Sequence, residues 1–359
     1  MSVDLTVIVI ARNEEATIGP CLEACIRSVR GAQQEDLIQS AEVILADSAS
    51  TDRTVEIARA FPVTIVQLRP DWPLSAGAGR FVGLRHARGE LVLFVDGDYV
   101  LFEDWLPAAI RALRHSTDIA AVCGTDVEET SGDTVLDRRQ RAWLSALRAE
   151  PEAVPVGLYR RNSLRAVGGI HPFLKGGEDR DLAHRLRAAG HRLIRVDLNM
   201  GRHHWSESGR MDYVTYFRSV LAWSRGDGQA YRLRRQDAAV HSATRRRYAD
   251  SRFLMHYLLG LALAVLVLLN LAALSPPLVW IAIVGDALAF AVVVIVRRRR
   301  GWTWHELAFE LHVVPYALIR HGGFLLGMLR RVPDVGSYPT GERILQSAGL
   351  PDVSHRGSD

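Results

Sequence analysis

The segment Glu90–Asp98, with the sequence ELVLFVDGD, joins an apolar run to two aspartates separated by one glycine. A short, continuous apolar run is typical of a strand that is buried on both faces of a sheet. Similar runs occur as LTVIVIA (5–11), AEVILADS (41–48) and VTIVQL (63–68), and helices are predicted after them at about 14–30, 52–60 and 76–88. This alternation predicts an α/β fold with a mostly parallel sheet covered by helices on both faces.

Polar residues follow several of these predicted strands. Ligands of such sheets bind at the carboxyl ends of the strands, where different strands bring their side chains together. The candidate ligand-binding residues of this part of the chain are therefore Ala11, Asn13, Glu14, Asp47, Arg80, Asp96 and Asp98.

Asp96 and Asp98 lie on the turn that ends the strand of the opening segment. Two carboxylates in this position can hold a hard divalent cation, Mg²⁺ or Mn²⁺, whose other ligands are water and the oxygens of a diphosphate. Asp-Gly-Asp is also a common turn sequence, so the structural alternative is a turn without a metal.

Asp47 and Arg80 are weaker candidates when each is taken alone. The Asp47 carboxylate can accept hydrogen bonds from a ribose or a base, but it can equally be a turn aspartate with capping partners nearby. Small residues surround Arg80, so that its guanidinium can approach a phosphate.

Glu178 and Asp179 follow a Gly-Gly pair and begin a helix predicted to run to Gly190. A carboxylate here can act as the general base that deprotonates an attacking hydroxyl. The structural alternative is that both acids interact with the dipole of the helix.

In this order, the four motifs resemble those of the family 2 glycosyltransferases, which are inverting enzymes with the GT-A fold, and the resemblance covers roughly residues 3–210. It implies that ARNEE (11–15) and Asp47 contact the nucleotide, that Arg80 is a donor-site arginine, and that Asp96 and Asp98 bind the nucleotide and its metal. It further implies that Asp179 is the catalytic base of the Glu178–Asp179 pair. A histidine of this family can reach the metal or the diphosphate, which makes His203 and His204 candidates; a structural histidine is the alternative.

The chain departs from the family pattern at two points. Phe81 stands where the family often has a polar residue, and the Gln-x-x-Arg-Trp motif of processive polymerases is absent from the sequence. We therefore expect transfer of a single sugar, and the Glu-Asp pair favours a hydroxyl as the acceptor. The alternatives are a polyprenyl-phosphate glycosyltransferase and a noncatalytic membrane scaffold that keeps the fold.

The second half of the chain is strongly apolar. Residues 253–274 and 278–296 are each long enough to cross a bilayer as a helix, and arginines flank the pair on both sides. The positive-inside rule then places both ends in the cytoplasm. The predicted organisation is a catalytic domain (1–225), a basic juxtamembrane linker (226–252), two transmembrane helices (253–296), an interfacial amphipathic or third membrane segment (297–332) and an irregular tail (333–359).

Composition narrows the functional classes. Of 44 basic residues only Lys175 is a lysine, and no nucleic-acid motif accompanies the arginines, so we expect no nucleic-acid partner. Three cysteines form neither a disulfide framework nor a metal set. The N-terminal sequence does not have the pattern of a signal peptide. We expect a multi-pass protein of the cytoplasmic membrane whose catalytic domain faces the cytoplasm and whose acceptor is a membrane-embedded lipid-linked glycan or glycolipid.

Overall fold

The structure, a computed structural model, describes residues 3–127, 151, 153–203, 213–237 and 319–348. The chain divides into two compact units. The first consists of Met1–Ser131, Gln140–Asp212 and Arg330–Asp359, and the second consists of Gly132–Arg139 and Tyr213–Leu329.

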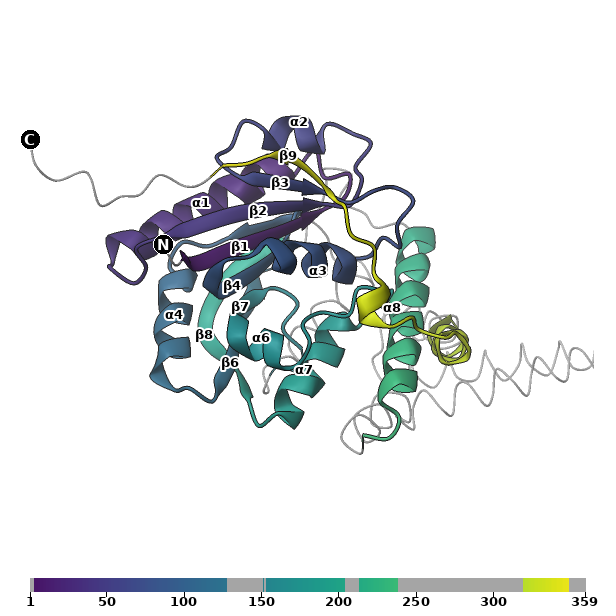
Figure 1. Cartoon of the computed structure of the whole chain (residues 1–359). Helices are drawn as coiled ribbons and strands as arrows, with labels where there is room; N and C mark the ends of the chain where they lie inside the picture. Colours follow the sequence, from purple (N-terminus) through teal and green to yellow (C-terminus); the bar gives the residue numbers. More distant parts are fainter. Residues whose placement is uncertain (1–2, 128–150, 152, 204–212, 238–318, 349–359) are drawn as a thin grey trace, which may run out of the picture. The chain divides into compact units, whose positions relative to one another are not determined.

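The first unit is built on one sheet, which in the described residues has nine strands in the order β5-β8-β6-β7-β4-β1-β2-β3-β9 (Figure 1). The strands are β1 (Val3–Ala11), β2 (Ala41–Asp47), β3 (Thr64–Gln67), β4 (Gly89–Asp96), β5 (Tyr99–Leu101), β6 (Ile119–Val127), β7 (Gly157–Arg160), β8 (Arg192–His203) and β9 (Arg343–Gln346). The four strands foreseen from the apolar runs, β4, β1, β2 and β3, are parallel neighbours. On either side of them the sheet is mixed, because β7 and β9 join it antiparallel. The α/β class is thus confirmed, and the sheet is parallel only at its centre and between β6 and β8.

Helices connect these strands, and those that begin at residues 18, 54, 76 and 178 lie close to the predicted positions. They are α1 (Ile18–Gln34), α2 (Thr54–Ala58), α3 (Ala76–His86), α4 (Trp105–His115), α6 (Arg161–Ala166) and α7 (Glu178–Ala188). α1 begins four residues later than the predicted helix (18 against 14), because residues 12–17 form a loop that belongs to the candidate site.

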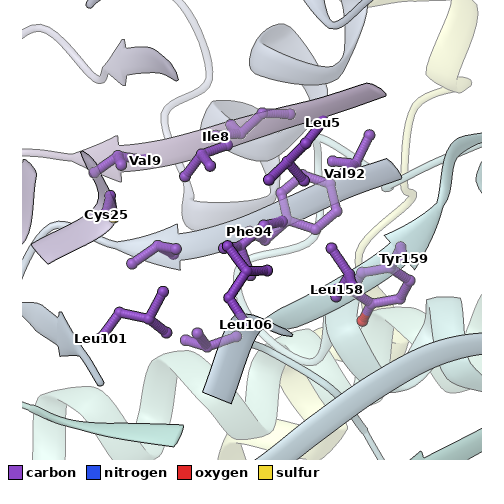
Figure 2. Close-up of a cluster of buried hydrophobic side chains, with 14 of the residues drawn as sticks. Leu5, Ile8, Val9, Cys25, Val92, Phe94, Leu101, Leu106, Leu158 and Tyr159 are labelled. Atoms are coloured by element: carbon purple, nitrogen blue, oxygen red, sulfur yellow. The ribbon is translucent and has the colours of Figure 1, made fainter. Parts of the chain in front are cut away.

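The core lies around the central strands. Side chains of β1 and β4 such as Leu5 and Val92 are fully buried, and Phe94 meets the ring of Tyr159 edge to face at 5.6 Å between centroids. Figure 2 shows these side chains together with Cys25 of α1. All three cysteines are buried and free.

α3 packs directly on β1 through glycines. A Cβ atom at Gly83 would lie 2.4 Å from Cγ2 of Ile8, and one at Gly79 would lie 3.1 Å from Cγ2 of Ile10. Because these two positions carry no side chain, the helix approaches the sheet closely and carries Arg80 to the carboxyl end of the parallel strands.

The C-terminal segment corrects one expectation. Residues 333–359 were expected to be irregular, but Val335–Ser337 form a 3₁₀ turn and β9 pairs antiparallel with β3 (Figure 1). The strand has only four residues and no long apolar run, and it is stabilised by pairing with the sheet edge rather than by a local preference.

The second unit contains α8 (Tyr213–Arg234) and a helix at 319–329. The expected domain boundary at 225 falls inside α8. The two helices pack through glycines: a Cβ atom at Gly228 would lie 2.0 Å from the carbonyl oxygen of Phe324, and one at Gly327 would lie 2.1 Å from that of Arg225.

The predicted membrane spans, 253–274 and 278–296, lie outside the described residues, as do most of the linker 226–252 and of the segment 297–332. Among the helices that the structure does describe, none combines the length and apolarity needed to cross a bilayer.

Candidate active site

The predicted strand-end residues meet at one edge of the sheet. In the register of the parallel strands, Ala11 of β1 is paired with Asp47 of β2, and Ile10 is paired with Asp96 of β4. The strand ends therefore bring together carboxylates that are 49 residues apart in sequence (47 and 96), as the sequence predicts.

The loop after β1 is tied to the loop after β2. The Asn13 backbone is left-handed (φ 59°), and its N–H donates to Oγ of Ser50 at 2.9 Å. The N–H of Thr51 donates to Oδ1 of Asn13 at 2.9 Å, and the N–H of Glu14 donates to Oγ1 of Thr54 at 2.7 Å. These bonds fix the ARNEE loop as a rim of the site.

Asp47 is fully buried below that rim. Its Oδ1 accepts a hydrogen bond from the Ser50 hydroxyl at 2.5 Å, and its Oδ2 accepts bonds from the Ser50 N–H at 3.1 Å and from Nε2 of Gln67 at 2.9 Å. In this arrangement Asp47 organises the loop, and contact with a nucleoside stays a prediction. Sequence reasoning missed Gln67, although its position at the end of β3 marks it for the same edge of the sheet.

Arg80 lies buried between two carboxylates. Its Nη1 donates to Oε1 of Glu178 and its Nη2 donates to Oδ1 of Asp96, both at 2.6 Å, and only 4% of the arginine is exposed. Burial raises the pKa of Glu178 and of Asp96, although the guanidinium opposes this. In this structure Arg80 therefore positions two acids of the site, and its direct contact with a phosphate stays a prediction.

Glu14, Asp96 and Asp98 form an acidic cluster above Gly97. The Cγ atom of Glu14 lies 3.3 Å from the point where a Cβ atom would stand on Gly97. Burial, then the charges of Asp98 and Asp96, raise the pKa of Glu14 to about 7, against a hydrogen bond from Thr17. Three carboxyl groups therefore lie close enough to raise the pKa of one of them.

His203 stands beside this cluster at the end of β8. Its Nδ1 lies 3.5 Å from Oδ1 of Asp98, and its ring packs edge to face against Tyr99 at 4.9 Å between centroids. Burial lowers the pKa of His203, but Asp98 and Asp96 outweigh this effect and raise it to about 9. The other candidate, His204, lies outside the described residues.

The chemistry of this corner fits a hard divalent cation. Within the described parts of the chain no three metal-binding side chains converge into a preformed cage. Mg²⁺ and Mn²⁺ are, however, commonly bound by one or two carboxylates together with the phosphates of a substrate. Asp96 and Asp98 supply two carboxylates, His203 supplies an imidazole beside Asp98, and Glu14 adds a third carboxyl group nearby.

Glu178 and Asp179 begin α7, as predicted. The helix starts after Gly177, whose backbone is left-handed (φ 69°). A Cβ atom at Gly77 of α3 would lie 3.3 Å from Cβ of Glu178, so this glycine lets α7 approach α3. Glu178 is buried and bound to Arg80, whereas Asp179 is only partly buried and accepts a hydrogen bond from the N–H of Arg180 at 2.8 Å.

Comparison with known sequences agrees with this geometry. The family described as "Glycosyl transferase family 2" matches residues 6–167. A dolichyl-phosphate beta-glucosyltransferase of Trichomonas vaginalis is 30% identical over 131 residues, which cover 34% of this chain and 40% of that protein. An O-antigen chain rhamnosyltransferase of Salmonella anatum is 23% identical over 201 residues, which cover 52% of this chain and 64% of that protein. The chain thus spans less than two thirds of the length of either curated relative.

Among solved structures, a mannosyltransferase from Pyrobaculum calidifontis in complex with GDP-Man and Mn²⁺ is similar in fold, with a TM-score of 0.60 and 20% identity. The match covers 90% of this chain and 88% of that chain. The sequence match over 6–167, the shared fold and the strand-end acids all agree with a family 2 glycosyltransferase domain in this part of the chain.

Proposed function

We propose that this protein is an inverting glycosyltransferase that moves one sugar from a nucleotide-diphosphate sugar to a hydroxyl of a membrane-associated acceptor. The observation that carries the proposal is the Arg80 bridge. It joins Asp96, on the donor side at the end of β4, to Glu178, the neighbour of Asp179 on α7. One buried guanidinium thus links the donor-binding corner to the start of the helix that carries the base.

The donor half consists of the loop after β1, the Asp47 corner and the acids at the end of β4. Asp96 and Asp98, with His203 beside Asp98, would hold Mg²⁺ or Mn²⁺. The cation would offset the charge of the departing diphosphate. In the similar Pyrobaculum structure Mn²⁺ accompanies GDP-Man, which supports a nucleotide sugar and a divalent cation as ligands here.

The acceptor half consists of α7 and the loop before it. Glu178 is poorly placed to accept a proton, because it is buried and bonded to Arg80. Asp179 is more accessible, and as the general base it would take the proton of the acceptor hydroxyl. The hydroxyl oxygen would then bond to the anomeric carbon from the side opposite the departing diphosphate, which inverts the configuration.

The membrane part of the proposal rests on the sequence. The apolar stretches 253–274 and 278–296 and their arginine flanks favour a helical hairpin in the cytoplasmic membrane, with the catalytic domain on the cytoplasmic face. One curated relative is named for a dolichyl-phosphate acceptor and the other for an O-antigen chain. Both names support a lipid-linked acceptor, and we propose a role in envelope or extracellular polysaccharide synthesis.

A polyprenyl-phosphate acceptor is the second candidate, and the dolichyl-phosphate relative favours it. A phosphate oxygen is already ionised at neutral pH and needs no strong base. Transfer to a hydroxyl would therefore require Asp179 as a general base, whereas transfer to a phosphate would not.

The test measures transfer by the full chain in lipid, with Mn²⁺ or Mg²⁺, to a lipid-linked glycan and to a polyprenyl phosphate. For a hydroxyl acceptor, Asp179→Asn lowers the rate by about 10²- to 10⁴-fold while the Kd of the nucleoside diphosphate changes little. Glu56→Gln, an exposed acid on α2, serves as the control and keeps the rate. Transfer to polyprenyl phosphate that is indifferent to Asp179→Asn would establish the second candidate instead.

A further inference from the structure

A tyrosine near the C-terminus of the described chain is buried against the catalytic domain. Only 4% of Tyr338 is exposed, and its hydroxyl donates a hydrogen bond to the carbonyl oxygen of Pro73 at 2.9 Å. Its ring makes edge contacts with Trp72, Phe81 and Phe173, with 5.9, 5.5 and 5.3 Å between centroids. Together with buried residues of β2, β3 and α3, these rings form a small core separate from the main one.

The three rings come from segments that also build the candidate site. Trp72 lies in the loop after β3, and Phe81 is the neighbour of Arg80 on α3. Phe173 lies in the loop that leads to Glu178. Tyr338 therefore contacts the segments on both sides of the Arg80–Glu178 ion pair.

The two loops are also tied to each other directly. The Ser75 hydroxyl donates to the carbonyl oxygen of Pro172 at 2.9 Å, and Nζ of Lys175 donates to that of Leu74 at 3.0 Å. Ser75 also caps α3, since its Oγ accepts a hydrogen bond from the N–H of Ala78 at 3.0 Å. The start of α3 and the loop before α7 are thus bonded to each other, and Tyr338 contacts neighbouring residues of both, Pro73 and Phe173.

Independent contacts hold the tyrosine's segment in place. Glu342 bonds with Nε2 of His86 at 2.7 Å, and Arg85 donates to the carbonyl oxygen of Pro339 at 3.2 Å. Further along, Nε2 of Gln346 donates to the carbonyl oxygens of Phe61 and Val63, both at 2.9 Å, while β9 pairs with β3. The segment 335–346, which we call the strap, is thus held on the domain from Pro339 to Gln346, and the tyrosine lies near its start.

We propose that the strap positions the active site, and that Tyr338 is a positioning residue for glycosyl transfer. Tyr338 fills the space between Trp72, Phe81 and Phe173 and so fixes the start of α3 relative to the loop before α7. As a result Arg80 pairs with Glu178, and Asp179 faces the acceptor. This inference rests on the proposed function. A C-terminal segment, which lies outside the residues matched by the family model (6–167), would then contribute to the glycosyl transfer reaction.

The physical reason is the steep dependence of the reaction on geometry. A displacement of about 1 Å at the reacting groups can lower a rate by about 10²-fold. Removing the ring opens a cavity between two loops that lead directly to Arg80 and Glu178. The proposed donor half also includes the loop after β1 and the Asp47 corner, which are not part of these two loops, so donor affinity should change less than the rate.

The experiment compares Tyr338→Ala and the milder Tyr338→Leu with Leu113→Ala in the full chain in lipid. Leu113 is fully buried on α4 in the main core, so its truncation also leaves a cavity but spares the strap. For each variant we would measure kcat, the Kd of the nucleoside diphosphate, Tm, and deuterium uptake of residues 171–178. Tyr338→Phe, which keeps the ring and loses the bond to Pro73, is the conservative rescue.

We expect the alanine and leucine variants to lower kcat by about 10-fold or more, to change the Kd by less than about threefold, and to raise uptake at 171–178. Leu113→Ala should lower Tm while leaving kcat and this uptake near those of the wild type, and Tyr338→Phe should keep most of the rate. Equal loss of kcat in Leu113→Ala at an equal fall in Tm, or unchanged uptake at 171–178 in both Tyr338→Ala and Tyr338→Leu, would overturn the strap proposal. A wild type without transfer to any acceptor would instead overturn the proposed function, and the uptake comparison would still decide whether the strap orders the loop.

Discussion

Replacing Arg80 by methionine would remove the cation that the buried Glu178 and the partly buried Asp96 share. In the wild type, its guanidinium nitrogens lie 2.6 Å from an oxygen of Glu178 and 2.6 Å from an oxygen of Asp96. Breaking a buried ion pair by removing one partner costs about 3–5 kcal/mol, because the remaining charge is left without compensation. At about 2–4 °C per kcal/mol for a domain of this size, we expect Tm to fall by about 6–20 °C.

The loss of stability caused by Arg80→Met should increase with pH. Burial already raises the pKa of Glu178 and of Asp96 above the ordinary carboxyl value, and Arg80 opposes that shift. A group whose pKa is raised by folding costs no stability below its unfolded pKa and costs progressively more as pH rises through its folded pKa. Without Arg80 the shift grows, so Arg80→Met should be most destabilised near pH 8 and least near pH 4.

The assay is urea unfolding of both proteins, followed by tryptophan fluorescence in EDTA at several pH values. The double variant Arg80→Met/Glu178→Gln is the control, because a neutral amide replaces one of the two unpaired charges and should recover part of the stability. A loss below about 1 kcal/mol that does not vary with pH would show that Arg80 does not compensate these buried charges.

Three further predictions concern other parts of the domain. In EDTA, the free energy of unfolding of the wild type should fall as pH rises from about 4.5 to about 7, because the pKa of Glu14 in the folded protein is raised to about 7. Glu14→Gln should reduce this dependence on pH in urea unfolding. An unchanged dependence would contradict the raised pKa of Glu14. Gly83→Ala should cost about 1–3 kcal/mol, because its Cβ atom would lie 2.4 Å from Cγ2 of Ile8. Ile8→Ala, which removes that methyl group, should therefore cost less in the Gly83→Ala background than in the wild type, and a Gly83→Ala variant as stable as the wild type would refute the close packing of α3 on β1. Burial raises the pKa of Glu342, but hydrogen bonds from its own backbone N–H and from His86 outweigh this effect and lower the pKa. The charged carboxylate therefore adds to the free energy of unfolding above the unfolded carboxyl pKa, and this contribution is lost as pH falls. Glu342→Gln should therefore lower Tm at pH 7 but not at pH 3, and an equal effect at both values would argue against the charged contact.

The centre of the fold was predictable because its signals are local. Apolar runs such as 5–11 and 91–95 are continuous, which indicates strands covered on both faces, and polar residues follow each run directly. Parallel pairing then places Asp47 and Asp96 at one edge without further information. The first turn of α7 was equally readable, because Gly177 precedes two acids.

Contacts between segments far apart in the sequence could not be predicted from such local patterns. Nothing near Arg80 indicates that its guanidinium pairs with Asp96 and Glu178, which lie 16 and 98 positions further along the chain. The resemblance implies that Arg80 lies in the donor site, and in the structure its guanidinium pairs with two carboxylates. Likewise β9 has four residues, and its pairing with β3 depends on an edge that is formed almost 280 positions earlier.

The most direct measurement is release of nucleoside diphosphate from a panel of nucleotide sugars by the full chain in lipid, with and without Mn²⁺ or Mg²⁺, in the wild type and in Asp98→Asn. We predict that one donor is consumed by the wild type only when the metal is present, and that this release is lost in Asp98→Asn. Failure to bind or consume any nucleotide sugar, or equal release by both proteins without metal, would contradict a metal-assisted glycosyltransferase site at the end of β4.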